Sequence, residues 1–140
     1  MMSSAIPEIA VIDTHALIWW IDGDRRRIGR RALRFFDHVD EGRAVACIPT
    51  VALIELSESV HSGKVSLYRP FDAVLIGIRA TPSRYQIVPL TGEIVARAHA
   101  LFVIPERGDR LIAATAAELG YPIVTRDAAI TDAIGVDHVW

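Results

Sequence analysis

Short, uninterrupted apolar segments recur along this chain, and stretches with helical periodicity separate them. The segments are residues 8–13, 44–48, 86–89 and 122–125, with a shorter edge segment at 137–139. Strands that are apolar on both faces belong inside a parallel sheet, because crossover helices cover both of its sides. The pattern predicts an α/β fold: a three-layer α/β/α sandwich with a central, mainly parallel sheet of four to five strands.

The helical segments lie between these strands and have recognisable ends. They are expected at residues 16–21, 30–41, 50–61, 70–79, 91–102, 109–119 and 128–134. Thr14 and Thr91 are predicted N-caps, and Gly120 is predicted to end the alanine-rich helix. Neither an internal repeat nor a long linker divides the 140 residues, so we expect one domain over residues 1–140.

The composition excludes several classes of protein. Hydrophobic residues at 51% and charged residues at 23% exclude a disordered chain. Cys47 is the single cysteine, so no internal disulfide can form. No uncharged run approaches the ~18 residues of a membrane span, and the N-terminus lacks the pattern of a secretion signal. We therefore expect a cytoplasmic protein without a membrane partner.

Four acidic residues stand where apolar segments begin, end or are interrupted. Asp13 closes the first strand and Asp127 follows the fourth, Glu55 interrupts an apolar helix, and Asp109 opens the alanine-rich helix. Parallel strands place their carboxyl ends at one edge of the sheet, where ligands bind. The pattern predicts that the four carboxylates share one site. Their mutual repulsion there requires a cation to offset it.

Carboxylate oxygens are the ligands that hard divalent cations select, which indicates Mg²⁺ or Mn²⁺. A cation held in this way can activate a water, polarise a phosphodiester and stabilise the leaving oxygen. Two ions roughly 3.5–4 Å apart would divide these tasks. The four acids are thus candidates both for binding metal and for catalysing phosphodiester hydrolysis.

Each acid also has a purely structural interpretation. Asp13 can cap a helix, Asp109 can complement a helix dipole, and Asp127 can start a turn. Glu55 can face water beside Glu58. Asp132, one turn into the last helix, is a candidate peripheral ligand.

Other chemistries lack their characteristic residues. A haloacid dehalogenase-type phosphatase has a second acid two positions after the first, where this chain has His15. A receiver domain has a late lysine, whereas the sole lysine here is Lys64, before the third strand. Neither a glycine-rich phosphate loop nor a GxSxG or HExxH motif is present.

Arginines are concentrated in one segment, with six between residues 25 and 34. The planar guanidinium suits bidentate phosphate contacts. Arg25, Arg26, Arg27 and Arg30 are therefore candidates for contacting the phosphates of a nucleic acid. A solvated loop and helix face is the alternative interpretation.

Several motifs together resemble the PIN-domain ribonucleases, and within them the VapC-type toxins of toxin–antitoxin pairs. They are IAVIDTHALIWWI, IPTVALIELSE followed by HSGKVSL, and GDRLIAATAAELGYPIVTRDAAI, in this order. The resemblance covers nearly the whole chain. It implies a parallel α/β/α sheet whose acidic pocket binds Mg²⁺ or Mn²⁺ and cuts single-stranded RNA. A catalytically inactive RNA-binding or assembly module is the alternative.

The resemblance also implies roles and partners. Asp13, Glu55, Asp109 and Asp127 match the metal-site positions of the family, and Thr14 and Thr125 match its supporting hydroxyl residues. A homodimer and a cognate antitoxin are the implied protein partners, and the four arginines named above would contact RNA or the antitoxin. One departure concerns an additional Asp that many relatives carry shortly before the acid of DRLIAA. Here the segment holds Glu106, so either Glu106 replaces that ligand or the site has one fewer.

Overall fold

A single five-stranded sheet forms the centre of the computed structural model, which describes residues 5–140. Its strands are β1 (Ile9–Ile12), β2 (Val45–Pro49), β3 (Tyr85–Val88), β4 (Ile123–Val124) and β5 (His138–Val139). Their order is β3-β2-β1-β4-β5, and every neighbouring pair is parallel. The predicted sheet is confirmed, and all of it is parallel.

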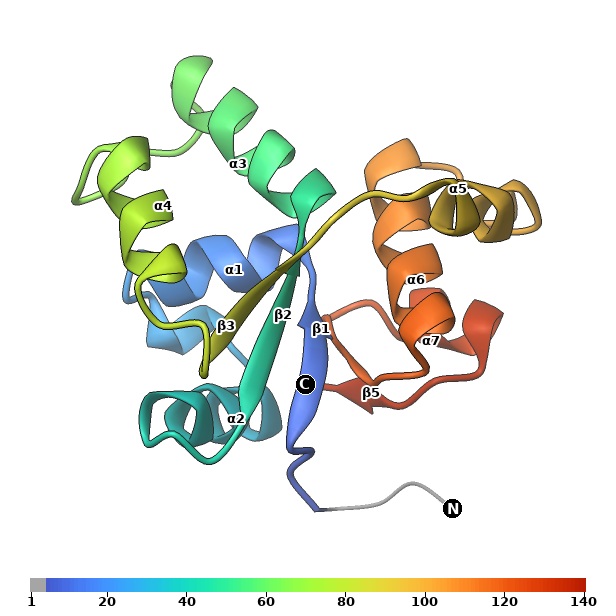
Figure 1. The fold of residues 1–140 in the computed structure, drawn as a ribbon, viewed down its shortest axis with the longest axis horizontal. Coiled ribbons are helices and arrows are strands. Elements are labelled where there is room, and N and C mark those ends of the chain that lie inside the picture. The colour runs from blue at the N-terminus through green and yellow to red at the C-terminus, as the bar shows by residue number, and fades with distance from the viewer. Residues whose placement is uncertain (1–4) are drawn as a thin grey trace.

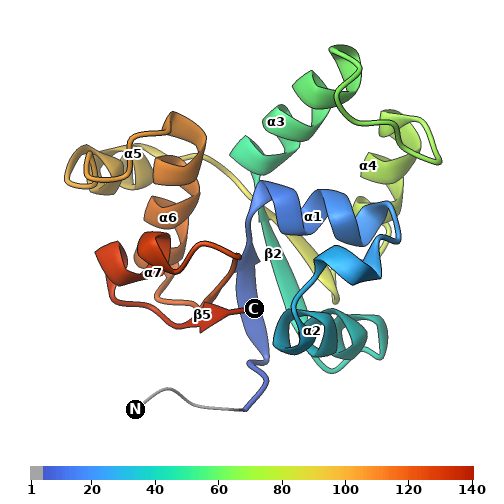
Figure 2. The same cartoon turned by 180° about the vertical axis from the view of Figure 1, so that it is seen from behind.

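Helices cover both faces of this sheet. They are α1 (Thr14–Ile21), α2 (Arg30–Asp40), α3 (Thr50–His61), α4 (Phe71–Arg79), α5 (Gly92–His99), α6 (Arg107–Leu119) and α7 (Ala128–Ile134). Figures 1 and 2 show α1 to α4 on one side of the strands and α5 to α7 on the other. This division follows from right-handed crossovers that run first toward β3 and then back toward β5. The three-layer sandwich is confirmed.

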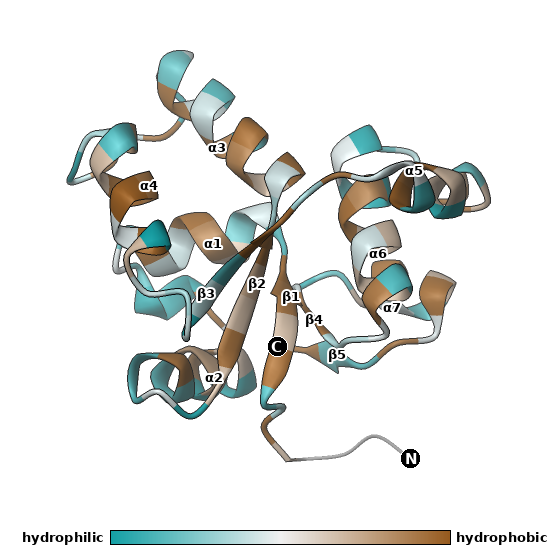
Figure 3. Ribbon diagram, viewed as in Figure 1, coloured by the Kyte–Doolittle hydropathy of each residue, from teal (hydrophilic) through white to brown (hydrophobic). Residues whose placement is uncertain are grey.

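The core consists of the strands and the helix faces that pack on them. Val11, Ile12 and Ile123 on the strands are fully buried, as are Phe35 on α2 and Leu56 on α3. In Figure 3 the strands β1 and β2 are coloured mostly as hydrophobic, whereas the outer turns of the helices are hydrophilic. Burial of apolar surface on both faces therefore holds the sheet between the helical layers.

Some helix ends differ from the sequence prediction. Asp13, and not Thr14, caps α1, because its carboxylate accepts a hydrogen bond from the Ala16 N–H at 2.8 Å. Helix α5 ends at His99 instead of residue 102, since backbone turns after it lead Ile104 into the core. A short 3-10 helix, Arg25–Arg27, occupies a segment for which no structure was predicted. The caps at Thr91 and Gly120 are confirmed.

The central position of β1 brings distant parts of the chain together. The Asp13 N–H donates to the Val124 carbonyl at 3.1 Å, which joins the end of β1 to the end of β4. Helices α3 and α6 pack against each other beside this point. The carboxyl ends of the central strands therefore meet the N-terminal parts of three helices. Among residues 5–140, no helix is long and apolar enough to cross a membrane.

Candidate active site

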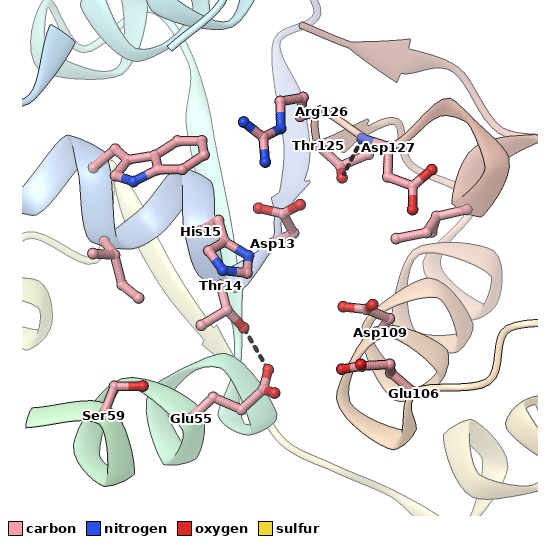
Figure 4. Close-up of a pocket in the computed structure, with 13 residues that line it drawn as sticks. Asp13, Thr14, His15, Glu55, Ser59, Glu106, Asp109, Thr125, Arg126 and Asp127 are labelled. Carbon is pink, nitrogen blue, oxygen red and sulfur yellow. Dashed lines mark hydrogen bonds between the residues drawn. The ribbon is translucent and has the colours of Figure 1, made fainter. Parts of the chain in front are cut away.

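A cavity of about 290 Å³ lies at the carboxyl ends of β1 and β4, and we call it the acidic cavity. It is lined by Asp13, Thr14, His15, Ile18, Trp19, Glu55, Ser59, Glu106, Asp109, Thr125, Arg126, Asp127 and Ile130. All four predicted acids are in this set. Figure 4 shows their side chains around one space, although they come from four separate places in the sequence.

Asp13 forms the inner wall of the acidic cavity. Its cap interaction with the Ala16 N–H fixes the carboxylate at the start of α1. Burial raises the pKa of Asp13 above its ordinary value, because desolvation disfavours the charged form. Hydrogen bonds from Thr125 and Ala16, and the positive charges of His15 and Arg126, partly oppose this rise in pKa. Asp13 therefore both caps α1 and belongs to the acidic site.

Glu55 reaches the cavity from the second turn of α3. The Thr14 hydroxyl donates to Glu55 Oε1 at 2.5 Å, so the supporting residue predicted beside Asp13 orients a different acid. The Glu55 carboxylate also lies against Gly108 at the start of α6, where an added Cβ would overlap it. The absence of a side chain at residue 108 makes room for Glu55.

Helix α6 contributes Asp109 and Glu106 from its first turn and N-cap position. The pKa of Asp109 is raised first by burial and then by the negative charges of Glu106, Glu55 and Asp13. Glu106 makes no capping hydrogen bond, and its side chain lies beside Asp109 in Figure 4. The structure therefore places Glu106 in the cavity.

Asp127 stands at the outer edge of the cavity, where it caps α7. Its Oδ1 accepts a hydrogen bond from the Ala129 N–H at 3.0 Å, and its own N–H donates to the Thr125 hydroxyl at 3.2 Å. Thr125 is fully buried between Asp13 and this turn. Asp132, the candidate peripheral ligand, is exposed and does not line the acidic cavity.

Some residues that line the cavity were not among the predicted site residues, and Arg126, Ser59 and His15 are the polar ones. Arg126 is exposed, and its guanidinium carbon lies 5.2 Å from the centre of the Trp19 ring. It directly precedes Asp127 in the motif IVTRD, which was the available signal. Ser59 follows Glu55 by four residues, and helical spacing would have placed it on the same face. His15, whose contact with Trp19 spans 5.7 Å between ring centres, also lines the cavity.

The predicted arginine cluster is divided by the structure. Arg25 makes a bidentate ion pair with Asp37, with both N–O distances 3.2 Å. Arg30, the first residue of α2, lines neither the acidic cavity nor a cavity beside it. Arg26 and Arg27 line a cavity that adjoins the acidic cavity. Only part of the cluster is therefore placed near the acids.

The donor set fits a divalent cation. As the side chains stand, no three His, Cys, Asp or Glu residues in the described part of the chain converge closely enough to hold an ion. The acids nevertheless act on one another, because three carboxylates raise the pKa of Asp109. A cation bound among hard oxygen ligands would remove this repulsion, as such sites require. The four acids of the cavity supply the oxygen ligands that such a cation selects, so the residues present fit the ion.

Removing the charge of Asp13 is expected to stabilise the metal-free protein. Asparagine caps helices as well as aspartate does, so Asp13→Asn keeps the cap and deletes a buried charge. We expect the free energy of unfolding to rise by about 1 kcal/mol at neutral pH. Stabilising substitutions commonly have an effect of this size. Denaturant unfolding in EDTA measures it.

The same substitution has a defined pH dependence. Because burial raises the pKa of Asp13 in the folded state, its ionisation costs stability as the pH rises through that pKa. The gain from Asp13→Asn should therefore vanish below the ordinary carboxyl pKa of about 4, where Asp13 is neutral in both states. The exposed control Asp132→Asn should show no such trend. A loss of stability at neutral pH would contradict the inference that burial disfavours the charged form of Asp13.

The fold and the cavity define a class: α/β/α proteins with one parallel sheet that gathers carboxylates beyond its strand ends. The PIN domain family model matches residues 10–135, so the chain belongs to the PIN domain family. Within that family it is of the VapC type. The curated relative Ribonuclease VapC22 of Mycobacterium tuberculosis is 33% identical over 119 residues, which are 84% of this chain and 85% of the relative.

Solved structures share the fold. A chain in the crystal structure of VapBC2 from Rickettsia felis, bound to a DNA fragment from its promoter, matches with a TM-score of 0.66 and 14% identity. The match covers 93% of this chain and 96% of that chain. A chain of DNA-bound VapBC from Salmonella typhimurium matches with a TM-score of 0.60 and 19% identity, over 99% and 97% of the two chains. At these identities the similarity concerns the fold alone.

Proposed function

We propose that this protein is a metal-dependent endoribonuclease that acts as the toxin of a toxin–antitoxin pair. Its substrate is single-stranded RNA or the loop regions of folded RNA. The observation that carries the proposal is the acidic cavity, in which carboxylates from β1, α3, α6 and the end of β4 meet in a PIN-family chain. The ribonuclease relative supports the choice of RNA as substrate.

The acids divide the work between them. Asp13 and Asp109 are proposed to hold the principal metal ion, Mg²⁺ or Mn²⁺, because both carboxyl groups are at least partly buried and lie near each other's charge. Glu55 assists coordination or positions the attacking water, and Asp127 completes the site or helps to hold a second ion. When bound, the metal supplies polarisation of the phosphodiester and a water of lowered pKa.

The remaining residues position these groups. Thr14 holds the Glu55 carboxylate through its hydroxyl, and Thr125 supports both Asp13 and the turn of Asp127. Glu106 is proposed to take the place of the additional acid found in relatives, since it lines the cavity beside Asp109. Arg126 places a positive charge at the cavity, where it can contact a phosphate next to the one that is cut.

Metal removal tests this function. We expect the purified, folded protein to cut a mixture of structured cellular RNAs with Mg²⁺ or Mn²⁺, and cleavage to stop in EDTA and return when metal is restored. Calorimetric titration with Mn²⁺ should show saturable binding that Asp13→Asn abolishes. Intact RNA in every lane, together with no saturable Mn²⁺ binding, would instead identify a non-cleaving RNA-binding or assembly module.

A cognate antitoxin and a second copy of the chain are the proposed protein partners. The two structural neighbours above are VapBC complexes, which supports an antitoxin partner for this chain. Light scattering of the isolated protein tests the homodimer, with an expected mass of twice 15.4 kDa. A mass of one chain at all concentrations would exclude it.

A further inference from the structure

A second cavity adjoins the acidic cavity and has the opposite electrostatic character. Its volume is about 920 Å³, and it runs between α1, the 3-10 helix and the segment after α3. Its residues are His15, Ile18, Trp19, Asp22, Asp24, Arg26, Arg27, Ser59, Lys64, Val65, Ser66 and Arg126. We call it the basic groove, because its four cationic residues outnumber its two acidic ones.

The basic groove adjoins the acidic cavity. Both are lined by the same five residues, His15, Ile18, Trp19, Ser59 and Arg126. Trp19 forms a shared wall, and the guanidinium groups of Arg27 and Arg126 lie 5.9 Å and 5.2 Å from its ring centre. These contacts hold two cations in place around the junction.

Two cations of the groove are free to bind an anion. In the part of the chain that the structure describes, neither Arg26 nor Lys64 takes part in a salt bridge, and both are exposed. Arg27 forms a salt bridge with Asp24 at 3.2 Å, so these two opposite charges of the groove offset each other. The other acid, Asp22, has a buried Oδ1 without a hydrogen-bond partner. Among the described residues, the positive charge of the groove outside salt bridges therefore belongs to Arg26, Lys64 and Arg126, of which Arg126 lies against the Trp19 ring.

The chain's only lysine thus lies beside the site. Arg110 on α6 makes contacts of a different kind. It donates to the carbonyl groups of Ile104 and Pro105 and stacks over Phe102. Arg110 lines neither cavity. The basic residues Arg26, Arg27, Lys64 and Arg126 line the two cavities, and none of them comes from α6.

A nucleic acid strand that crosses a carboxylate site needs such an arrangement. Its phosphates are repelled by the acids except at the metal, so the flanking phosphates need cations to hold the strand in place. Resting on the proposed function, we infer that the basic groove is the track by which single-stranded RNA enters the acidic cavity. Arg26 and Lys64 neutralise flanking phosphates, and Arg126 binds the phosphate at the junction.

The test separates binding from cleavage. In the Asp109→Asn background, anisotropy of a labelled single-stranded RNA of about ten nucleotides, within the site sizes of single-strand binders, gives the affinity over a KCl series. Adding Arg26→Ala and Lys64→Ala should lower the slope of log affinity against log salt by about 0.7 for each lost phosphate contact. The matched control is Arg34→Ala with Arg79→Ala, which removes equal charge from exposed helix positions outside both cavities.

The outcomes are distinct. Reduced slope and weaker binding in the groove variant, with the control unchanged, support the track, and in the cleavage-competent chain the same variant should raise KM more than it lowers kcat. Equal slopes in groove variant and control, or no salt-dependent binding by the parent, overturn it. The proposal is also overturned if a glutamate-rich peptide binds the groove variant more weakly than the parent while RNA binds both equally. The groove would then be a binding site for protein. Groove-dependent RNA binding by a chain that never cuts RNA would refute the proposed function, but it would not refute the inference that the basic groove binds RNA.

Discussion

Replacing Asp109 with asparagine is expected to reduce the rate of RNA cleavage by more than 100-fold, beyond the roughly 10–100-fold typical of losing a group that only orients a metal ligand. Asp109 projects from the first turn of α6 toward Asp13, Glu55 and Glu106, and their charges raise its pKa. Asparagine keeps the size of the side chain but loses the negative charge that would hold a cation. The loss should appear in single-turnover cleavage at saturating RNA.

The matched control for this change is Asp132→Asn. Asp132 is also a helical aspartate, but it is exposed and lies outside the acidic cavity. Its variant should cleave RNA at the wild-type rate. Equal activity of Asp109→Asn and wild type would remove Asp109 from the site, whereas equal loss in both variants would indicate damage to folding. Mn²⁺ titration of each variant separates loss of metal from loss of substrate binding.

Replacing Gly108 with alanine is expected to reduce cleavage by about 100-fold, the cost of displacing a catalytic group by roughly 1 Å. A Cβ at residue 108 would overlap the carboxylate of Glu55, which is the flexible end of its side chain. Glu55 must then move and give up its hydrogen bond from Thr14. The fold should persist, because alanine favours the helical conformation that residue 108 already has.

Gly92→Ala is the control for this steric effect. Gly92 is also a glycine in the first turn of a helix, and no heavy atom lies within 4 Å of the place that its Cβ would take. Circular dichroism and thermal unfolding should show both variants folded, with cleavage impaired only in Gly108→Ala. Unimpaired cleavage by Gly108→Ala would mean that the position of Glu55 does not limit the reaction.

The layers and the sheet of this fold were predictable because strands and helices differ in their hydrophobic pattern. Continuous apolar runs such as Ile9–Ile12 indicate burial on both faces, and the helical stretches between them require crossovers. The order of the strands was not predicted, because it depends on which edge of the sheet each crossover reaches. The early end of α5 depends on Ile104 entering the core, a tertiary contact that no local pattern reports.

The acids were predictable one by one, but their surroundings were not. Strand ends and helix starts identify Asp13 and Asp109 as candidates, whereas the contact between Thr14 and Glu55 spans two helices. The spacing of arginines could not distinguish Arg25, which pairs with Asp37, from Arg26, which has no such pairing. In the sequence, the position of Lys64 serves only to exclude a receiver domain. Its place in the basic groove depends on how α3 crosses α1.

The neighbouring positions of β1 and β4 also have a consequence for how this protein is made. Asp13 emerges early from the ribosome, but the strand that pairs with β1 at its acidic end, and Asp127 after it, are synthesised last among the site's acids. Domains generally fold as units, and β1 can pair with β4 only after β4 has been synthesised. A growing chain that ends before residue 127 therefore lacks one of the four acids and the strand that joins β1 at the acidic cavity, so the site is completed only after residues 123–127 have been synthesised.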